Sequence, residues 1–227
     1  MLIYLIRHGR TDWNDRRMVM GREPVGLNRR GREMVEVLAG HLAPERIGAV
    51  YSGTLARVRE TAAILAGAWG APVIDEPRLD ESPFERWVGM TYDELAGDPD
   101  FVLYQTRPTG ARFSQGEGIA EIQRRALAAV ERAAAERLAG KVALVSHSDV
   151  IKPVITRYLG MELDAMHRVA VANASVTLLD LDQPARPRIR YLNLMPWKWR
   201  LGLTDRPDEP IPGGGTQPGS PDHPGGE

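Results

Sequence analysis

The sequence predicts an α/β protein in which helices flank a mainly parallel sheet in three layers. Short apolar runs typical of buried strands alternate with amphipathic segments at helical spacing along most of the chain. Charged motifs also follow three of the predicted strands directly, which is where parallel sheets place ligand-binding residues. With 43% hydrophobic and 26% charged residues, the composition is that of an ordinary globular protein.

The first part of the chain contains three predicted strands with helices between them. "MLIYLI" is a continuous apolar run, as expected of a strand that is covered on both faces. Asn28 can cap a helix over 29–42, where Met34 and Leu38 fall on one face. The other expected elements are strands over 47–52 and 71–76 and, between them, a helix over 55–70 closed by Gly70.

Residues 77–118 break this alternation, because prolines and glycines interrupt every pattern except a short helix at "TYDELAG". Irregular segments of this length are usually functional or mobile, so we expect 82–115 to cover the substrate. Within it, "RWVGM" and "RPTGARF" supply arginines and aromatic rings that could receive an anionic or ring-bearing substrate. Regular structure resumes with helices over 117–140 and 149–160 and strands over 141–146, 174–181 and 186–194.

Composition and charge exclude several classes of function. A net charge of -1 argues against a protein that coats nucleic acid, and the absence of cysteine excludes disulfides, thiolate nucleophiles and cysteine-ligated metals. No run is long enough for a signal peptide or a membrane span, so we expect a cytoplasmic protein with no membrane partner. We expect one domain over 1–203 and a disordered tail over 204–227, of which half is proline or glycine.

Three charged motifs follow predicted strands: "RHG" after the first, "SGTLARVRET" after the second and "SHSD" after "KVALV". Because the carboxyl ends of parallel strands lie along one edge of a sheet, we expect Arg7, His8, Arg57 and His147 to converge. Two arginines make a poor metal site, since they are always protonated, but their planar forks suit phosphate oxygens. The start of the helix near Asp149 can direct free N–H groups at the same anion.

An imidazole at the centre of a phosphate site suggests that His8 is a nucleophile. Neighbouring arginines disfavour its charged form, and a backbone carbonyl on one ring nitrogen would fix the tautomer. Gly9 suits a sharp turn close to the ligand. Cleavage also needs a proton donor for the leaving alkoxide, and "LDESPFERWVGMTYDEL" offers Asp80, Glu81 and Glu85.

The chain resembles the histidine phosphatase superfamily, whose fold is phosphoglycerate-mutase-like. "LIRHGRTDWN", "SGTLARVRETA", "LDESPFERWVGMT", "GEGIAEIQRRA", "LVSHSDVI" and "NASVT" occur in the order that the family shows, over residues 1–194. The resemblance implies that His8 is phosphorylated, that Glu81 acts as acid and then base, and that no cofactor or metal is needed. It further implies a set of residues that bind the phosphoryl group: Arg7, Asn14, Arg57, His147 and Ser148, the last through its backbone N–H.

The sequence departs from the family pattern at several positions. Glu85 and Val88 stand where the family has G-x-W-E-G, Arg10 replaces an acidic or amide residue, "GEG" replaces G-E-S, and "SHSD" replaces S-H-G-G. We expect these changes to tune the choice of substrate.

The sequence favours a metal-independent phosphatase that acts on a small phosphorylated metabolite. The first alternative is a phosphoglycerate-type mutase, disfavoured because the stretch from Glu81 to Gly116 is short. The second is an inactive phospholigand-binding protein. Pairing of the last strand could also form a homodimer.

Overall fold

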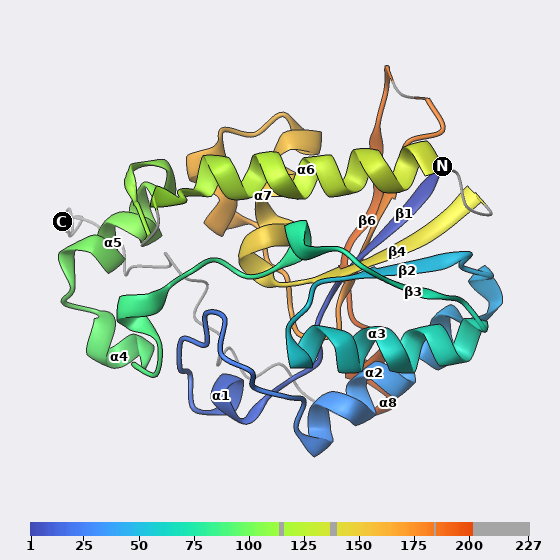
Figure 1. The fold of residues 1–227 in the computed structure, drawn as a ribbon, viewed down its shortest axis with the longest axis horizontal. Coiled ribbons are helices and arrows are strands. Elements are labelled where there is room, and N and C mark those ends of the chain that lie inside the picture. Colours follow the sequence, from blue (N-terminus) through green and yellow to red (C-terminus); the bar gives the residue numbers. More distant parts are fainter. Residues whose placement is uncertain (114–115, 137–139, 184, 202–227) are drawn as a thin grey trace, which may run out of the picture.

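A computed structural model describes residues 1–113, 116–136, 140–183 and 185–201, so the predicted tail over 204–227 lies outside the described residues. Its centre is a six-stranded sheet with the strand order β3-β2-β4-β1-β5-β6 (Figure 1). The strands are β1 (Leu2–Arg7), β2 (Ala49–Ser52), β3 (Val73–Asp75), β4 (Lys141–Ser146), β5 (Val176–Asp180) and β6 (Arg188–Leu194).

Four neighbouring strands of the sheet, β3, β2, β4 and β1, run parallel, whereas β5 is antiparallel to both β1 and β6. The predicted mainly parallel α/β fold is therefore confirmed. β1 and β4 are buried along almost their whole length, as their continuous apolar sequences require. β3 and β6 form the two edges and expose alternate residues.

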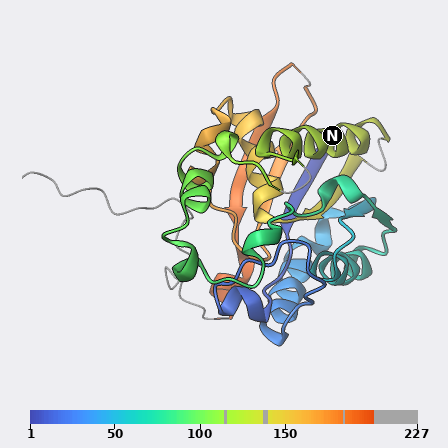
Figure 2. The ribbon, with the colours of Figure 1, turned by 60° about the vertical axis from the view of Figure 1, so that its left-hand side comes forward.

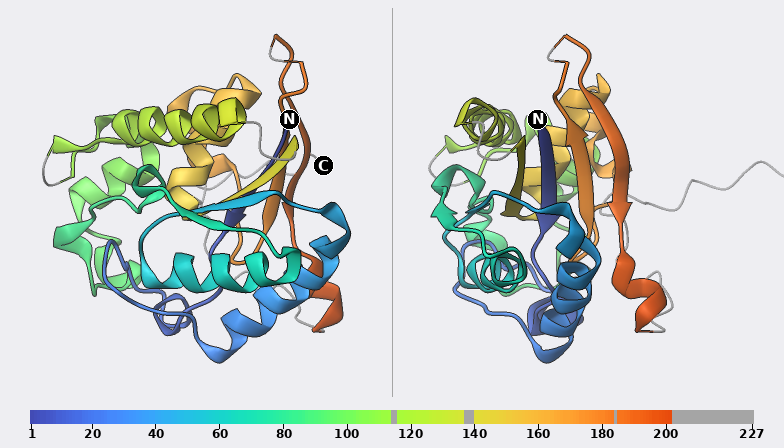
Figure 3. Two further views of the ribbon diagram at one scale, coloured as in Figure 1. Left: turned by 45° about the vertical axis from the view of Figure 1, so that its right-hand side comes forward. Right: turned by 90° about the vertical axis from the view of Figure 1, so that its right-hand side faces the viewer.

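Helices cover both faces of the sheet and complete three layers. Ile3 and Leu5 of β1 pack under α6 (Ile119–Glu136) and α7 (Ser148–Leu159), while Tyr4 and Ile6 point to the opposite core. That second core lies against three helices, α2 (Arg29–Leu42), α3 (Ala56–Trp69) and α8 (Pro196–Arg200). In the left view of Figure 3, α6 lies above the strands and α2 and α3 lie below them. No helix in the described part of the chain is both long and apolar enough to cross a membrane.

Helix ends follow the capping residues that the sequence contains. Asn28 caps α2 by accepting a hydrogen bond from the Gly31 N–H at 2.8 Å, as predicted. Gly70 closes α3 in the left-handed conformation, also as predicted, and Gly160 ends α7 in the same way. Sequence patterns missed α8 and the four-residue helix α1 (Asp12–Asp15), which Thr11 and Asn14 cap reciprocally.

The segment over 77–118 has more regular structure than expected. Besides the predicted short helix, now α4 (Tyr92–Leu95), it forms α5 (Pro99–Thr106), which Asp98 caps by accepting from the N–H groups of Asp100 and Phe101. Single 3₁₀ turns fill much of the remainder: η2 (Pro77–Leu79), η3 (Glu85–Trp87) and η4 (Pro108–Gly110). Figures 1 and 2 both place α4 and α5 at the end of the molecule opposite the N-terminus.

The loop after β1 packs unusually closely against α2. A Cβ on Gly9 would lie 2.7 Å from the Gly31 carbonyl oxygen and 2.8 Å from Val35, and a Cβ on Gly31 would lie 2.6 Å from the Arg10 nitrogen. Gly9 does not adopt a positive φ, so left-handed backbone does not account for a glycine at this position. Close backbone packing explains both glycines instead.

We predict that Gly31→Ala lowers the free energy of unfolding by roughly 1–3 kcal/mol, because its methyl group would displace the backbone of Arg10. Gly40→Ala is the matched control in the same helix, where a Cβ meets nothing within 4 Å. It should raise the free energy of unfolding by about 0.5–1 kcal/mol through helix propensity. Urea denaturation measures both, and equal effects of the two substitutions would contradict the packing argument.

Candidate active site

His8 lies directly beyond β1, and two separate segments hold its main chain. Its N–H donates to the Ser146 carbonyl at the end of β4, at 3.0 Å. Its own carbonyl accepts from the Ala174 N–H at 3.1 Å and from the Asn173 side-chain amide at 3.2 Å. The imidazole is therefore attached to a backbone that the centre of the sheet keeps in place.

One tautomer of His8 is selected by its neighbour. Nδ1 lies 2.7 Å from the Gly9 carbonyl oxygen, which can only accept, so Nδ1 carries the proton and Nε2 keeps its lone pair. Burial lowers the pKa of His8 well below its ordinary value, and the charges of Arg57 and Arg7 lower it further. At neutral pH, His8 is an uncharged base whose Nε2 can act as a nucleophile.

His147 follows β4 and forms the N-cap position of α7. Its ring centroid lies 5.2 Å from that of His8, with the two rings tilted by 61°. The side chain is fully buried, yet neither ring nitrogen has a hydrogen-bond partner among the described residues. Buried polar atoms without partners are costly, so a pair of them on one ring points to a ligand.

Arg57 stands in the first turn of α3 and is fully buried. Its terminal nitrogens donate to the carbonyls of Gly21 at 2.7 Å and Glu23 at 3.0 Å. Burial lowers its pKa to about 10, which leaves it charged at neutral pH. Arg7 donates to the Val171 carbonyl at 2.7 Å. Two buried guanidiniums beside two neutral imidazoles form a site that attracts an anion.

Of the three carboxylates considered as proton donors, Glu81 is the one that lies next to a histidine of the site. Its Oε2 lies 3.4 Å from His147 Nδ1, and its Oε1 accepts from the Ser82 N–H at 2.9 Å. Asp80 is engaged elsewhere by the Thr54 N–H and hydroxyl, and Glu85 is exposed.

Glu81 has an environment suited to proton transfer. Only 8% of the residue is exposed. Burial, together with the negative charge of Asp149, raises its pKa to about 7, although Arg57 opposes the shift. A carboxyl group with this pKa can donate and accept a proton near neutral pH.

Two further predicted contacts lie at the edge of the site. Asn14 Oδ1 accepts from the Thr11 N–H at 3.1 Å and from the Asn173 amide at 3.3 Å, which joins α1 to the loop that holds His8. Ser148 is the first residue of α7, where N–H groups have no acceptor within the helix. Asp149 does not cap this helix; it pairs with Lys152 at 3.4 Å.

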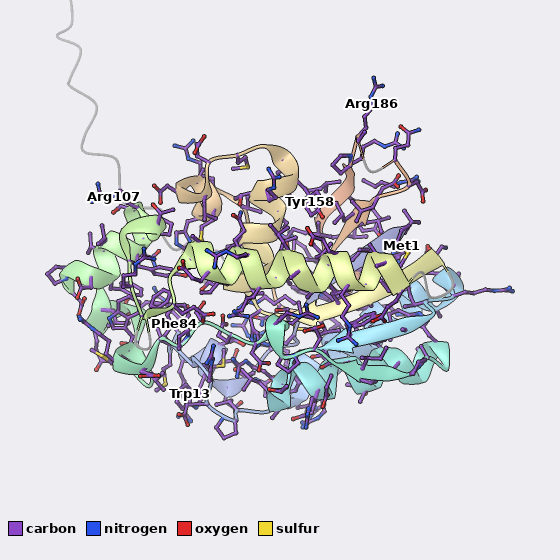
Figure 4. All side chains as sticks on the ribbon, turned by 45° about the horizontal axis from the view of Figure 1, so that its top comes forward. Met1, Trp13, Phe84, Arg107, Tyr158 and Arg186 are labelled. Carbon is purple, nitrogen blue, oxygen red and sulfur yellow. The ribbon has the colours of Figure 1, made fainter. Side chains whose placement is uncertain are left out.

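In the segment over 82–115, several of the arginines and aromatic rings that were expected to receive a substrate contact other residues of the protein instead. Trp87 and Phe113 pack edge to face in an aromatic cluster whose other members are Phe84, Phe101 and Tyr104. Arg86 pairs with Asp98 and Asp100, and Arg112 pairs with Glu121. Arg107 lies at the periphery (Figure 4). The aromatic residues therefore belong to the core that also packs under α6 and α7, and two of the arginines form ion pairs.

Asn173 is the positioning residue that sequence reasoning missed. The motif "NASVT" marked its place in the chain but carried no role, whereas the structure shows its amide donating to the His8 carbonyl. Within the described ranges, no group of three or more His, Cys, Asp or Glu residues could hold a metal ion.

Comparison with known proteins matches the same region of the chain. The family model described as "Histidine phosphatase superfamily (branch 1)" matches residues 3–194. The probable phosphoglycerate mutase GpmB of Yersinia pestis (strain Pestoides F) is 28% identical over 183 residues, which cover 80% of this chain and 85% of the relative.

Solved structures share the fold over most of their length. A mutant of the phosphoserine phosphatase from Entamoeba histolytica, in complex with phosphoserine, superposes with a TM-score of 0.76 at 26% identity and covers 86% of this chain and 97% of its own. Bacillus stearothermophilus YhfR superposes with a TM-score of 0.76 at 30% identity, over 83% and 95% of the two chains.

We predict that Glu81→Gln stabilises the protein increasingly as pH rises from 5 to 8. The folded state raises the pKa of Glu81 from 4.5 to about 7, so it binds a proton more tightly than the unfolded chain does. The wild-type free energy of unfolding therefore falls as pH rises through this window, and glutamine escapes this loss. The difference should reach on the order of 2 kcal/mol.

Urea denaturation at the two pH values measures this difference, with Glu36→Gln on the exposed side of α2 as the control for a lost surface charge. If the difference in free energy of unfolding between Glu81→Gln and the wild type did not change with pH, the raised pKa of Glu81 in the folded state would be contradicted.

Proposed function

Because the chain belongs to the histidine phosphatase superfamily (branch 1), we propose that it is a metal-independent phosphomonoester hydrolase working through a phosphohistidine intermediate. The observation that carries the proposal is the state of His8: buried, uncharged and held with Nε2 free, next to Arg7 and Arg57. Such a base is a competent nucleophile toward phosphorus.

In the first step, His8 Nε2 attacks phosphorus in line with the ester oxygen. The P–N bond forms as the P–O bond to the alcohol breaks, while Arg7, Arg57 and His147 hold the equatorial oxygens. Asn14 and the Ser148 N–H supply further polar contacts to the phosphoryl group. Glu81 donates its proton to the leaving alkoxide, which departs as the alcohol.

In the second step, the Glu81 carboxylate takes a proton from water as the water oxygen attacks phosphohistidine. The P–N bond breaks, inorganic phosphate leaves, and His8 and Glu81 return to their starting states. A pKa of about 7 for Glu81 supports both roles, because the group is protonated often enough to serve as acid and ionised often enough to serve as base.

A phosphoglycerate-type mutase is the second candidate, and the relative named as a probable phosphoglycerate mutase favours it. Two features support hydrolysis instead. The stretch from Glu81 to Gly116 is short, and Arg86 and Arg112 in it pair with carboxylates that would compete with a second anionic group of a substrate. The complete set of His8, Glu81 and His147 also argues against an inactive binding protein. A homodimer through the edge strand β6 stays a prediction.

The proposed function is tested by steady-state hydrolysis of p-nitrophenyl phosphate and a panel of small phosphomonoesters, with a chelator present. We expect turnover in the wild type. His8→Ala should lower kcat at least a thousandfold, because the substitution removes the atom that attacks phosphorus in the proposed mechanism. Turnover that survives His8→Ala would reject the mechanism, and phosphoglycerate interconversion without hydrolysis would favour the mutase.

The pH dependence of kcat/KM should include one descending limb that reflects the titration of Glu81. For an alkyl phosphate, kcat/KM should fall above about pH 7, since the acid form is then lost. Because burial and the two arginines hold the pKa of His8 well below its ordinary value, protonation of His8 should not lower activity on the acid side of this limb. Glu81→Gln should abolish the alkaline limb as well as slowing the reaction, and an unchanged limb in that variant would assign the titration to another group.

A further inference from the structure

Two guanidinium groups converge on the main-chain carbonyl of Glu81. Arg22, in the loop between α1 and α2, donates from Nε at 2.9 Å, and Arg125, on α6, donates from Nη2 at 3.5 Å. Arg125 also donates from Nη1 to the Arg78 carbonyl at 2.7 Å. α6 is thus bonded to the backbone on both sides of Asp80.

Glu117 joins the two arginines to each other. One carboxylate oxygen lies 3.2 Å from Arg22 Nη2, and the other lies 2.8 Å from Arg125 Nε. Glu117 and Arg125 are each no more than a fifth exposed, so these charge-assisted bonds are partly shielded from water. Arg22 comes from the loop before α2, whereas Glu117 lies just before α6 and Arg125 lies on it. We call these three residues the Arg22–Glu117–Arg125 clamp.

The carboxyl group of Glu81 has few restraints of its own. Its Oε1 accepts from the adjacent Ser82 N–H, and its Oε2 lies near His147, so the orientation of the side chain depends on the backbone that carries it. General acid catalysis requires the donor within hydrogen-bond distance of the leaving oxygen, and displacement by about 1 Å can cost a hundredfold in rate.

Building on the proposed function, we propose that the Arg22–Glu117–Arg125 clamp positions Glu81 for proton donation to the leaving group. None of the three side chains bonds to the Glu81 carboxyl group; each acts through the main chain or through another clamp residue. This assigns a role to the acidic residue of "GEG", which lies far from His8 in the sequence.

The test compares substrates that differ in their need for a proton. Glycerol 2-phosphate releases a strongly basic alkoxide, whereas p-nitrophenyl phosphate releases a weakly basic phenolate that needs little help. We expect Arg125→Ala and Glu117→Gln to lower kcat/KM at least tenfold for glycerol 2-phosphate and no more than threefold for p-nitrophenyl phosphate. Glu81→Gln should show the same selectivity more strongly.

Arg124→Ala is the matched control, because Arg124 neighbours Arg125 on α6 but is exposed and pairs with Glu121 rather than with a clamp residue. Arg124→Ala should leave kcat/KM unchanged for both substrates. Arg22→Ala removes a half-exposed member of the clamp and supplies a second variant if Arg125→Ala fails to fold. Inhibition by inorganic phosphate, measured in every variant, reports whether the phosphate site stays intact.

The outcomes separate the two proposals. The clamp proposal would be overturned if Glu81→Gln lowers kcat/KM selectively for glycerol 2-phosphate but the clamp variants do not. Such variants would lower kcat/KM equally for both substrates or leave it unchanged. A wild type that hydrolyses neither substrate would overturn the proposed function, and the clamp with it.

Discussion

The arrangement depends on two positive charges that are buried beside two histidines. Arg7 and Arg57 lie at the carboxyl edge of the sheet beside two imidazoles, and this environment cannot also hold charged histidines. The imidazoles are therefore neutral, and backbone carbonyls accept hydrogen bonds from both guanidinium groups. A doubly charged phosphoryl group is the partner that we propose for this edge of the sheet.

The two halves of the proposed chemistry rest on different parts of the fold. His8 and His147 extend directly from β1 and β4, which pair in parallel register at the centre of the sheet. Glu81 instead belongs to the segment over 77–118, whose aromatic cluster extends the core on the α6 face of the sheet. α6 connects the halves, since it packs on the sheet and bonds to the backbone around Glu81.

Much of this could be predicted from the sequence, because the signals involved are local. Buried strands have continuous apolar runs, Asn28 and Gly70 mark helix ends, and charged motifs follow the strands that lie side by side. α1, α5 and α8 are too short to show a helical period, and capping and tertiary packing stabilise them instead. The bond between Arg22 and Glu117 spans 95 positions, and no local pattern indicates such a contact.

The central claim is that His8 carries the phosphoryl group during turnover. Rapid acid-free quenching of Glu81→Gln with a reactive aryl phosphate, followed by peptide mass spectrometry, tests it most directly. Slow hydrolysis of the intermediate in this variant should leave a phosphoryl group, stable to base and labile to acid, on the peptide that contains His8. Phosphate on another residue, or turnover with no phosphorylated enzyme at any time point, would contradict the account.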